Sequence, residues 1–448
     1  MAVRRISSLV NLRGELFATT FCFAMGTVMK FIVSPILTRL LLPEAYGIVT
    51  IISSIAFIVE MLSDVGIVAF LVRYEKGDDP RVLNTLWTLR LIRALTNGAI
   101  VFLAAPWIAQ IYNEPSIVWP LRIYALWFVF FGFESISMSL AVRRKKFSII
   151  AYTELIVGVF SNIFVIVFSY FHRDPYGMIY GMLLNRFMVM VVSYFIYPDS
   201  RPRFTLDRDV ARALFGFTKF VWPSSVLALF LNQFDKVVFL RLFDLHLLGL
   251  YGLAGNIAGA VDSLVSRICK NVMYPRCASH FRENAQTFHI RYYKENVKLF
   301  AAINLLPAVV GGAAHLIIYI LFDVRYAAAA QVLVAFSIRG VLWSLAAPME
   351  NLLLAAGNVK IVLFGNISRV SCLVPGCLLG YYFGGFQGFL IGAIFEMVGP
   401  LVYYGVMQHR HGLMIHRYEI LRFGAPVVAF VASALVSSVI YGFLPPKV

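Results

Sequence analysis

The chain has 448 residues, of which 60% are hydrophobic and only 14% are charged, and its mean hydropathy is +0.79. A soluble globular protein contains about 25% charged residues, so this composition excludes an ordinary soluble fold. The formal net charge of +16 does not indicate a nucleic-acid-binding protein, because the positive residues gather in alternate loops between apolar segments. The composition predicts an all-α integral membrane protein.

Apolar segments predict thirteen helices, each long enough to cross a bilayer, which requires about 20 residues. Twelve are expected to form the core, and the thirteenth is an extra C-terminal helix. The expected ranges in chain order are 16–42, 46–72, 85–111, 118–141, 149–171, 176–197, 214–242, 247–273, 298–322, 328–355, 360–383, 386–408 and 424–444.

The loops between these helices alternate in charge. Basic residues cluster at the N-terminus, in the run Arg143–Lys146, after Pro198 and in every second loop beyond it. The positive-inside rule places this side in the cytoplasm, together with the N-terminus. The opposite loops are very short, whereas an external enzyme site would need an ordered loop or domain. No phosphate-binding loop, metal-ligand spacing or nucleophile motif is evident, so no enzyme activity and no cofactor are expected.

A short pattern occurs twice. TRLLLPEAYG, with Arg39 and Gly47, is followed 202 residues later by LRLFDLHLLG, with Arg241 and Gly249. We therefore expect two pseudo-repeated six-helix lobes, with a substrate site between them. The expected divisions are an N-terminal lobe at 1–197, a cytoplasmic linker at 198–213, a C-terminal lobe at 214–408, and a cytoplasmic loop with the extra helix at 409–448.

Ionisable residues inside the predicted helices cost at least ~2.5 kcal/mol each at a helix centre, so they usually face a cavity or a partner. The same 202-residue offset pairs Glu60 with Asp262 and Lys30 with Asn232. These matched positions predict that the charges face the interface of the lobes. Glu60 and Asp64 are four residues apart and are expected to share one helix face.

Structural roles remain open for several of these residues. Arg90 or Arg93 could satisfy Glu60 and Asp64 by ion pairing. Arg267 and Lys270 could extend to the membrane surface, and Arg39 and Arg241 could cap helix carbonyls. The spacing of Gly380 and Gly384 is typical of helix-packing sites.

The run TRLLLPEAYGIVTI, followed by SDVGI with Asp64 and Gly66 and then by Arg73, resembles the N-terminal signature of polysaccharide-exporter flippases. These belong to the multidrug/oligosaccharidyl-lipid/polysaccharide exporter superfamily. The resemblance is most specific over residues 35–75, and the helix number and the two lobes support it along the chain.

The resemblance implies an alternating-access flippase for undecaprenyl-pyrophosphate-linked oligosaccharide in a bacterial inner membrane, for lipopolysaccharide or exopolysaccharide synthesis. Expected partners are this substrate and membrane lipid, with a polysaccharide polymerase and export machinery as further candidates. No nucleic acid is expected, and the protein is expected to act as a monomer.

The resemblance also implies a cationic cavity for the pyrophosphate and the glycan, because their charge cannot cross hydrocarbon unpaired. The residues expected to line it are Lys30, Asn232, Lys236, Arg267 and Lys270. The residues expected to couple transport to an ion are Glu60, Asp64, Asp235 and Asp262. Arg39 and Arg241 are expected to have structural or gating roles.

Three other functions are weighed against this interpretation. A multidrug exporter of the same superfamily would prefer acidic binding lobes, and Lys30 disfavours that function. A membrane glycosyltransferase or O-antigen polymerase would need a sizeable external loop. A scaffold of the assembly machinery would not need to bear the cost of buried charges.

Overall fold

The computed structural model describes residues 2–197, 202–357 and 360–442; for residues 2–17, 220–221, 224, 228, 237–241, 416–422 and 442 it describes the backbone alone. Within these residues all regular secondary structure is helical, which confirms the predicted class. Ten of the described helical segments are long and apolar enough to cross a membrane, and a bent pair makes an eleventh. The chain is therefore a multi-pass membrane protein.

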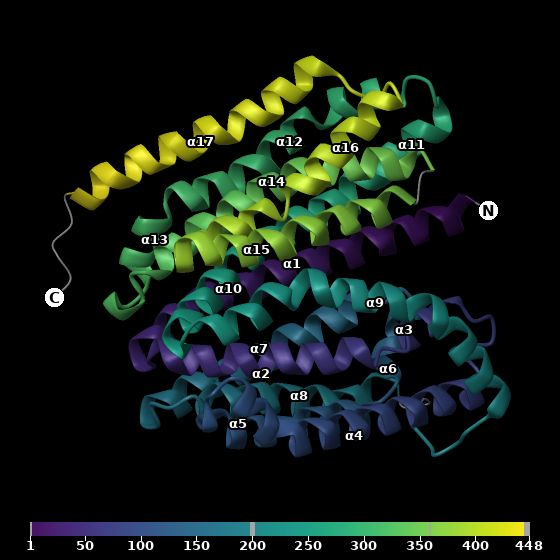
Figure 1. The fold of residues 1–448 in the computed structure, drawn as a ribbon. Helices are drawn as coiled ribbons and strands as arrows, with labels where there is room; N and C mark the ends of the chain where they lie inside the picture. The colour runs from purple at the N-terminus through teal and green to yellow at the C-terminus, as the bar shows by residue number, and fades with distance from the viewer. Residues whose placement is uncertain (1, 198–201, 358–359, 443–448) are drawn as a thin grey trace. The chain divides into compact units, whose positions relative to one another are not determined.

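The chain divides at Leu229–Phe230 into two compact parts, called unit 1 and unit 2 below. The helices of unit 1 are α1 (Ala2–Leu40), α2 (Pro43–Leu62), α3 (Ile67–Arg73), α4 (Pro80–Ile111), η1 (Pro115–Ile117), α5 (Val118–Phe133), α6 (Ser137–Arg143), α7 (Phe147–Phe171), α8 (Tyr176–Ile196) and the first part of α9 (Arg208–Leu242) (Figure 1). Unit 2 contains the rest of α9, α10 (Leu245–Ile268), the π-helix η3 (Cys269–Met273), α11 (Tyr274–Glu283), α12 (Phe288–Gly312), α13 (Ala314–Leu321), η4 (Val324–Tyr326), α14 (Ala329–Ala355), α15 (Lys360–Phe395), α16 (Val398–Arg410) and α17 (His416–Gly442).

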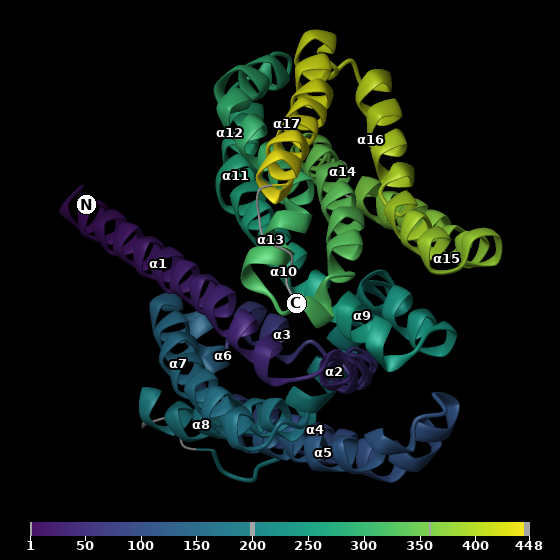
Figure 2. The same cartoon turned by 90° about the vertical axis from the view of Figure 1, so that its left-hand side faces the viewer.

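Helices pack lengthwise within each unit. In unit 1, α5 contacts both α4 and α8, and the three run alongside one another (Figure 1). In unit 2, α12 contacts both α14 and α17 (Figure 2). Large apolar side chains such as Phe171 and Tyr382 stay exposed, as expected for surfaces that face lipid.

The predicted linker is partly docked on unit 1. Helix α9 begins at Arg208, so the predicted helix start at residue 214 was wrong, and residues 198–201 lie outside the described part of the chain. Three linker N–H groups donate to one polar face of α4: Arg203 to Asn84 Oδ1 (3.0 Å), Thr205 to Thr88 Oγ1 (3.3 Å) and Asp207 to Thr85 Oγ1 (3.1 Å). The division between the compact units falls farther along the chain, inside α9.

Four predicted helices are interrupted or bent. The segment predicted at 46–72 is α2 and α3, and the segment predicted at 118–141 is α5 and α6. The segment predicted at 298–322 bends by 63° between α12 and α13. The segment predicted at 386–408 is interrupted at Glu396–Met397. Continuous helices were wrong for these segments because hydropathy does not register a short break whose polar groups are satisfied by neighbouring side chains.

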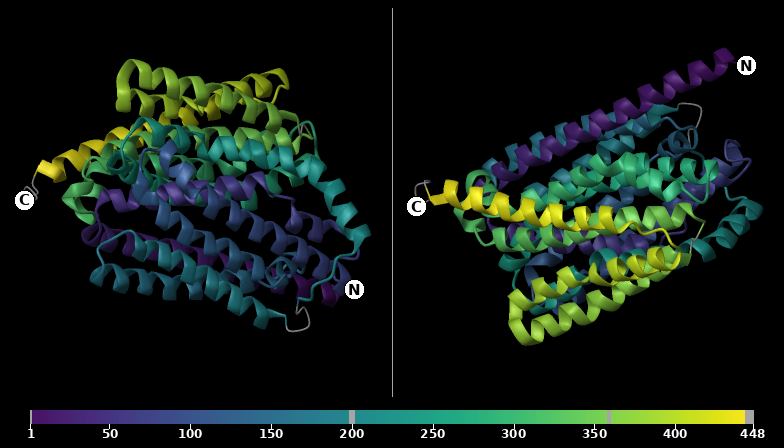
Figure 3. Two further views of the ribbon diagram at one scale, coloured as in Figure 1. Left: turned by 60° about the horizontal axis from the view of Figure 1, so that its bottom comes forward. Right: turned by 90° about the horizontal axis from the view of Figure 1, so that it is seen from above.

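Helix α15 contains a glycine hairpin. Gly384 and Gly385 leave helical geometry, and Gly385 has a φ of 54°, in the left-handed region that glycine adopts easily. The chain reverses there, and the second arm with α16 packs along the first arm (Figure 3). The reversal confirms the division predicted between the segments 360–383 and 386–408.

Arg143 ties the loop between α3 and α4 to the end of α6. Its guanidinium donates to the backbone oxygens of Leu71 (2.5 Å) and Tyr74 (2.6 Å) and lies 2.8 Å from the Asp78 carboxylate. Arg144 pairs with the same carboxylate at 3.3 Å. The basic run therefore joins two loops of unit 1, besides its predicted role in topology.

Neutralising Asp78 is expected to loosen this connection slightly. The hydrogen bond from Arg143 lowers the pKa of Asp78. Its stabilisation is therefore fully present above the unfolded-state pKa of about 3.9 and is lost as the pH falls through the lower folded-state pKa. At pH 7, Asp78→Asn mimics the acid state. We expect up to about fivefold faster amide hydrogen exchange over residues 74–79, because such an exposed pair contributes ~1 kcal/mol or less.

Asp79→Asn is the matched control for this measurement. Asp79 caps α4 by accepting from the backbone N–H of Arg81 at 2.8 Å, and asparagine caps a helix as well as aspartate does. The control loses the same charge without touching Arg143. Equal exchange rates in the two variants would contradict a specific role for Asp78.

Candidate functional site

Three acidic residues lie where a helix is interrupted. Asp64 lies between α2 and α3, Glu134 between α5 and α6, and Glu396 between α15 and α16. An interruption leaves backbone N–H and C=O groups without helical partners, so side chains have to supply the hydrogen bonds. Each interruption therefore gathers polar side chains inside an apolar bundle.

Asp64 organises the first interruption. Its Oδ1 accepts from the backbone N–H of Gly66 at 2.9 Å, and its Oδ2 accepts from Ser225 Oγ at 2.9 Å. Arg93 of α4 lies 3.8 Å from Oδ1 and donates to the carbonyl oxygen of Ser63 at 3.3 Å. Gly66 begins α3 with a left-handed φ of 69°, which glycine adopts without strain.

Helix α9 satisfies further groups of the same interruption. Thr218 Oγ1 donates to the carbonyl oxygen of Val65 at 2.9 Å, and Trp222 Nε1 donates to that of Leu62 at 2.8 Å. With Ser225, these donors are spaced by four and three residues, so they lie on one face of α9. That face holds the first part of α9 against unit 1.

Glu134 lies in the second interruption, between α4 and α8. Its side chain is buried, and its Oε2 lies 2.6 Å from Arg186 Nη2 of α8. Its backbone oxygen accepts from Trp87 Nε1 at 3.1 Å and from the guanidinium of Arg90. Tyr194 donates to the adjacent carbonyl oxygen, that of Phe133, at 2.6 Å. Side chains of α4 and α8 therefore replace the missing helical hydrogen bonds.

Three arginines of unit 1 surround one aromatic ring. The guanidinium carbons of Arg186, Arg90 and Arg93 lie 4.4, 5.6 and 5.8 Å from the ring centroid of Phe131. The half-buried Glu60 of α2 lies within electrostatic range of Arg93 and Arg186. The two interruptions therefore share one charged cluster.

Unit 2 contains a separate buried network at the third interruption. Glu396 is 1% exposed, forms an ion pair with Arg369, and lies 3.4 Å from Arg339 Nη1. Arg339 also lies 3.8 Å from Asp235 Oδ2, which accepts a 2.5 Å hydrogen bond from the hydroxyl of Tyr251. Two arginines and two carboxylates thus balance one another within the unit.

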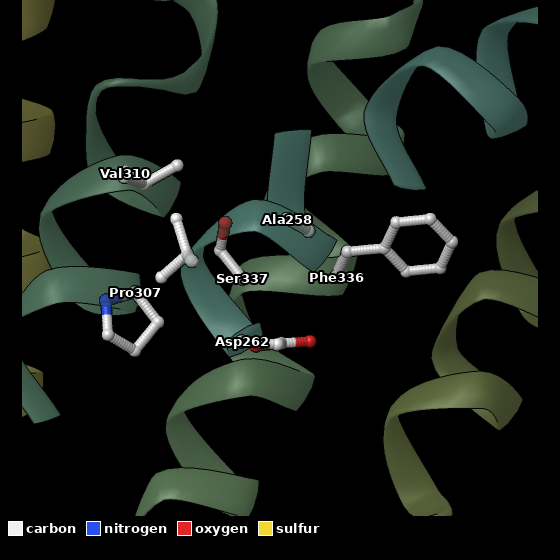
Figure 4. Close-up of a pocket in the computed structure, with 7 residues that line it drawn as sticks. Ala258, Asp262, Pro307, Val310, Phe336 and Ser337 are labelled. Carbon is white, nitrogen blue, oxygen red and sulfur yellow. The ribbon is translucent and has the colours of Figure 1, made fainter. Parts of the chain in front are cut away.

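Asp262 lies beside this network at a narrow pocket. The pocket is lined by Ala258, Val261, Asp262, Pro307, Val310, Phe336 and Ser337 of α10, α12 and α14 (Figure 4). Asp262 lies within electrostatic range of Arg339 and Arg369, and no described residue forms an ion pair with it shorter than 4 Å. The carboxylate is therefore less tightly held than those of Asp235 and Glu396.

The four predicted coupling residues fall into two pairs, each within electrostatic range of one arginine: Glu60 and Asp64 at Arg93, and Asp235 and Asp262 at Arg339. The prediction that Glu60 and Asp64 share one helix face was wrong. Asp64 lies beyond the end of α2, so it does not share a helix face with Glu60. Among the described residues, no group of three or more acidic, histidine or cysteine side chains is arranged to hold a metal ion.

The side chains of the predicted cavity residues take no part in the ion pairs described above. Lys30, Arg267 and Lys270 are exposed, as is Asn232, whereas Lys236 is half-buried. Lys270 lies on the π-helix η3, a distortion that is frequent at functional sites, and within electrostatic range of Glu350. Of the two predicted structural residues, Arg39 is exposed in the last turn of α1, and the side chain of Arg241 lies outside the described part of the structure.

The sequence interpretation gave too little weight to one face of α4. Four polar side chains of this face are spaced by three or four residues: Trp87, Arg90, Arg93 and Asn97. The first two donate to the interruption at Glu134, and the last two donate to the interruption at Asp64. Asn97 Nδ2, for example, donates to Ser63 Oγ at 2.8 Å. This polar spacing within an apolar segment was the signal available in the sequence.

Comparison with known proteins places the chain in a family. A family model described as polysaccharide biosynthesis protein matches residues 36–347. The lipopolysaccharide biosynthesis protein WzxC of Escherichia coli strain K12 is 22% identical over 398 residues, covering 87% of this chain and 78% of WzxC. The succinoglycan biosynthesis transport protein ExoT of Rhizobium meliloti strain 1021 is 25% identical over 250 residues, which is 55% of this chain and 50% of ExoT.

Solved structures show the same fold. The lipid II flippase MurJ in an inward closed conformation aligns with a TM-score of 0.72 and 13% identity, covering 97% of this chain and 93% of that chain. An inward-facing multidrug resistance MATE family transporter of the MOP superfamily aligns with a TM-score of 0.65 and 15% identity, covering 88% and 94%. The chain therefore has the all-helical fold of exporters of this superfamily, as predicted.

Proposed function

Because the chain belongs to the polysaccharide biosynthesis protein family, we propose that it is a flippase that moves undecaprenyl-pyrophosphate-linked oligosaccharide across the bacterial inner membrane by alternating access. The oligosaccharide would serve lipopolysaccharide or exopolysaccharide synthesis. The proposal includes a cytoplasmic N-terminus, because the basic loops lie on that side.

The observation that carries the proposal is the position of Asp64, Glu134 and Glu396 at interruptions of membrane-spanning helices, each beside an arginine. Interrupted helices inside a membrane are tolerated where they line a cavity or are buried in protein, and they mark substrate and ion sites in transporters. A protein without a transport role need not place so many charges at this depth.

The substrate explains why such a polar interior is useful. The pyrophosphate and the sugars cannot cross hydrocarbon without polar partners, whereas the polyprenyl chain can remain in lipid. We propose that Lys30, Arg267 and Lys270, with Lys236 and Asn232, contact the headgroup. Their exposed or half-buried side chains leave them accessible to a ligand.

We assign coupling to an ion gradient to the carboxylates that form no close ion pair with a described residue. Asp64 accepts hydrogen bonds from the Gly66 N–H and from Ser225, and Asp235 accepts one from Tyr251. Glu60 and Asp262 form no ion pair shorter than 4 Å with a described residue. We therefore propose Glu60 and Asp262 as the groups that bind and release a cation or a proton.

The test measures transfer of a lectin-readable undecaprenyl-pyrophosphate glycan between leaflets of proteoliposomes that contain only this protein. We expect protein-dependent transfer under an imposed ion gradient. Lys30→Ala, Glu60→Gln and Asp262→Asn are each expected to slow transfer about tenfold or more, the equivalent of removing one charged contact of ~1.5–3 kcal/mol. Equal reconstitution of every variant is verified by quantifying protein in the vesicles.

Asp244→Asn is the control with the same change of charge. Asp244 caps α10 by accepting from the N–H of Leu247 at 2.8 Å, a role that asparagine retains. It should transfer the glycan at the normal rate. Normal transfer by Glu60→Gln and Asp262→Asn would refute the coupling assignment, and no transfer by the unmodified protein across several glycans would refute the flippase.

A further inference from the structure

The three arginines around Phe131 carry hydrogen-bond donors that no described residue uses. The Nε–H groups of Arg90, Arg93 and Arg186 are buried and have no acceptor. Arg90 is only 4% exposed, so water does not readily replace the missing acceptor. Three buried donors without an acceptor among the described residues therefore lie beside one ring.

The positive charges of this cluster are incompletely paired. Arg186 has Glu134 at 2.6 Å, but Arg93 has Asp64 only at 3.8 Å, and both oxygens of Asp64 already accept other hydrogen bonds. Arg90 forms no ion pair shorter than 4 Å with a described carboxylate and donates to the backbone oxygen of Glu134 instead. Neither Arg90 nor Arg93 therefore has a carboxylate oxygen of a described residue within hydrogen-bond distance.

A row of aromatic rings leads to the cluster. Tyr124, Trp127 and Phe131 are spaced by three and four residues, so they lie on one face of α5. Neighbouring rings are stacked, with centroids 6.0 and 5.5 Å apart. Trp127 and Phe131 are half-buried, so part of each ring can be reached by a ligand. Aromatic faces pack well against the apolar C–H face of a sugar ring.

We propose that Arg90, Arg93 and Arg186, together with Trp127 and Phe131, form a subsite for a sugar ring that carries an oxyanion. The guanidinium fork matches the two oxygens of a carboxylate or phosphate group, and the rings hold the adjoining sugar. The oxyanion comes either from an acidic sugar of the glycan or from the phosphate at its lipid-linked end. This subsite rests on the proposed function, because it takes the transported headgroup as its ligand.

A purely structural role for the arginines makes a different prediction. Arg90 and Arg93 also brace the two interruptions, so their replacement weakens the fold of unit 1. Loss of folding would reduce binding of every ligand in proportion. Loss of an oxyanion subsite reduces binding of charged ligands alone, so the ratio of two affinities separates the two roles.

The experiment therefore compares one neutral saccharide with two charged forms of it. Dissociation constants are measured with the purified full-length protein for three probes: a glucuronic-acid-terminated disaccharide, the same disaccharide ending in glucose, and a farnesyl-diphosphate-linked form of the neutral disaccharide. At least one charged probe is expected to bind tenfold or more tightly than the neutral one. Arg93→Gln is expected to reduce this ratio about tenfold, as for one charge-assisted hydrogen bond.

Arg122→Gln is the matched control. Arg122 lies on the same helix α5, over the rings of Phe102 (5.2 Å) and Trp119 (5.3 Å), outside the cluster. It should leave the ratio unchanged. Arg186→Lys, which keeps the charge but loses the fork, provides a second variant if Arg93→Gln does not fold, and it should also lower the ratio.

Each outcome decides something. Preference for the glucuronic acid probe assigns the oxyanion to the glycan, and preference for the diphosphate probe assigns it to the lipid-linked end. Equal affinities for charged and neutral probes, or an unchanged ratio in both arginine variants, would overturn the subsite. Because transfer of a neutral glycan lipid is measured separately in proteoliposomes, that result would leave the flippase intact.

Discussion

Replacing Glu396 with glutamine is expected to destabilise unit 2 by about 3–5 kcal/mol. Glu396 is the shared partner of Arg339 and Arg369 and is 1% exposed, so its neutralisation leaves charged groups buried without their counter-ion. Asp235 remains 3.8 Å from Arg339, but Arg369 has no second carboxylate of a described residue within 4 Å. The measurement is the thermal unfolding midpoint of the detergent-purified protein, followed by fluorescence-detected size-exclusion chromatography, and a clear decrease is expected.

Glu283→Gln is the control for this prediction. Glu283 also binds an arginine, at 2.6 Å from Arg291 Nη1, but this pair lies at the exposed surface of unit 2. Exposed ion pairs contribute little, so no measurable change of the midpoint is expected. If both variants unfold at the same temperature as the unmodified protein, the buried network does not stabilise the unit.

The second large effect is expected from Gly388→Ala in the glycine hairpin of α15. A methyl group at residue 388 would overlap the backbone oxygen of Gly380 on the opposite arm. Both clashing groups are fixed to the backbone, so no change of rotamer relieves the overlap and the arms have to separate. We expect a loss of about 3 kcal/mol or more in stability, measured as a lower unfolding midpoint or a lower yield of monodisperse protein.

Gly384→Ala tests whether any glycine of the hairpin would give this result. No atom lies within 4 Å of a methyl group at this position, and its φ of −139° is open to alanine. Its effect should stay within about 0.5 kcal/mol, as for most surface substitutions. A Gly388→Ala protein as stable as Gly384→Ala would show that the two arms are not in close contact.

The sequence was sufficient to predict the class of fold. A backbone inside a membrane has to satisfy its own hydrogen bonds, so a long apolar segment leaves little choice except a helix. The break predicted between residues 383 and 386 coincides with the reversal at Gly384–Gly385. The predicted packing role of the Gly380–Gly384 spacing held only for Gly380, which faces Gly388, because Gly384 lies at the turn.

The interruptions were beyond the reach of the sequence pattern. SDVG around Asp64 contains Gly66, which adopts a left-handed φ at the break, whereas Gly132, two residues before Glu134, is still part of helix α5. What permits the second break is a set of donors from α4 and α8, many residues away along the chain. Long-range contacts of this kind carry no local signal.

The candidate site was predicted only in part, because its ion pairs also depend on long-range contacts. The four acidic residues were singled out by their depth in apolar segments, and the structure brings each pair within range of one arginine. Arg93 was one of two partners considered from the sequence for Glu60 and Asp64, and the structure places it 3.8 Å from Asp64. Arg339, which is shared by Asp235 and Asp262, lies on another helix, and choosing it requires the packing. The roles assigned to Lys30 and Lys270 stay predictions that transport measurements will test.

The glycine hairpin also bears on how the protein is made. No charged residue lies between Arg369 and Glu396, and the tip of the hairpin carries no basic residue that a translocon could retain on one side. We therefore expect the orientation of both arms to depend on basic residues that flank the hairpin in the sequence, Lys360 before the first arm and Arg410 after the second. We therefore expect the two arms to enter the bilayer together as one helical hairpin.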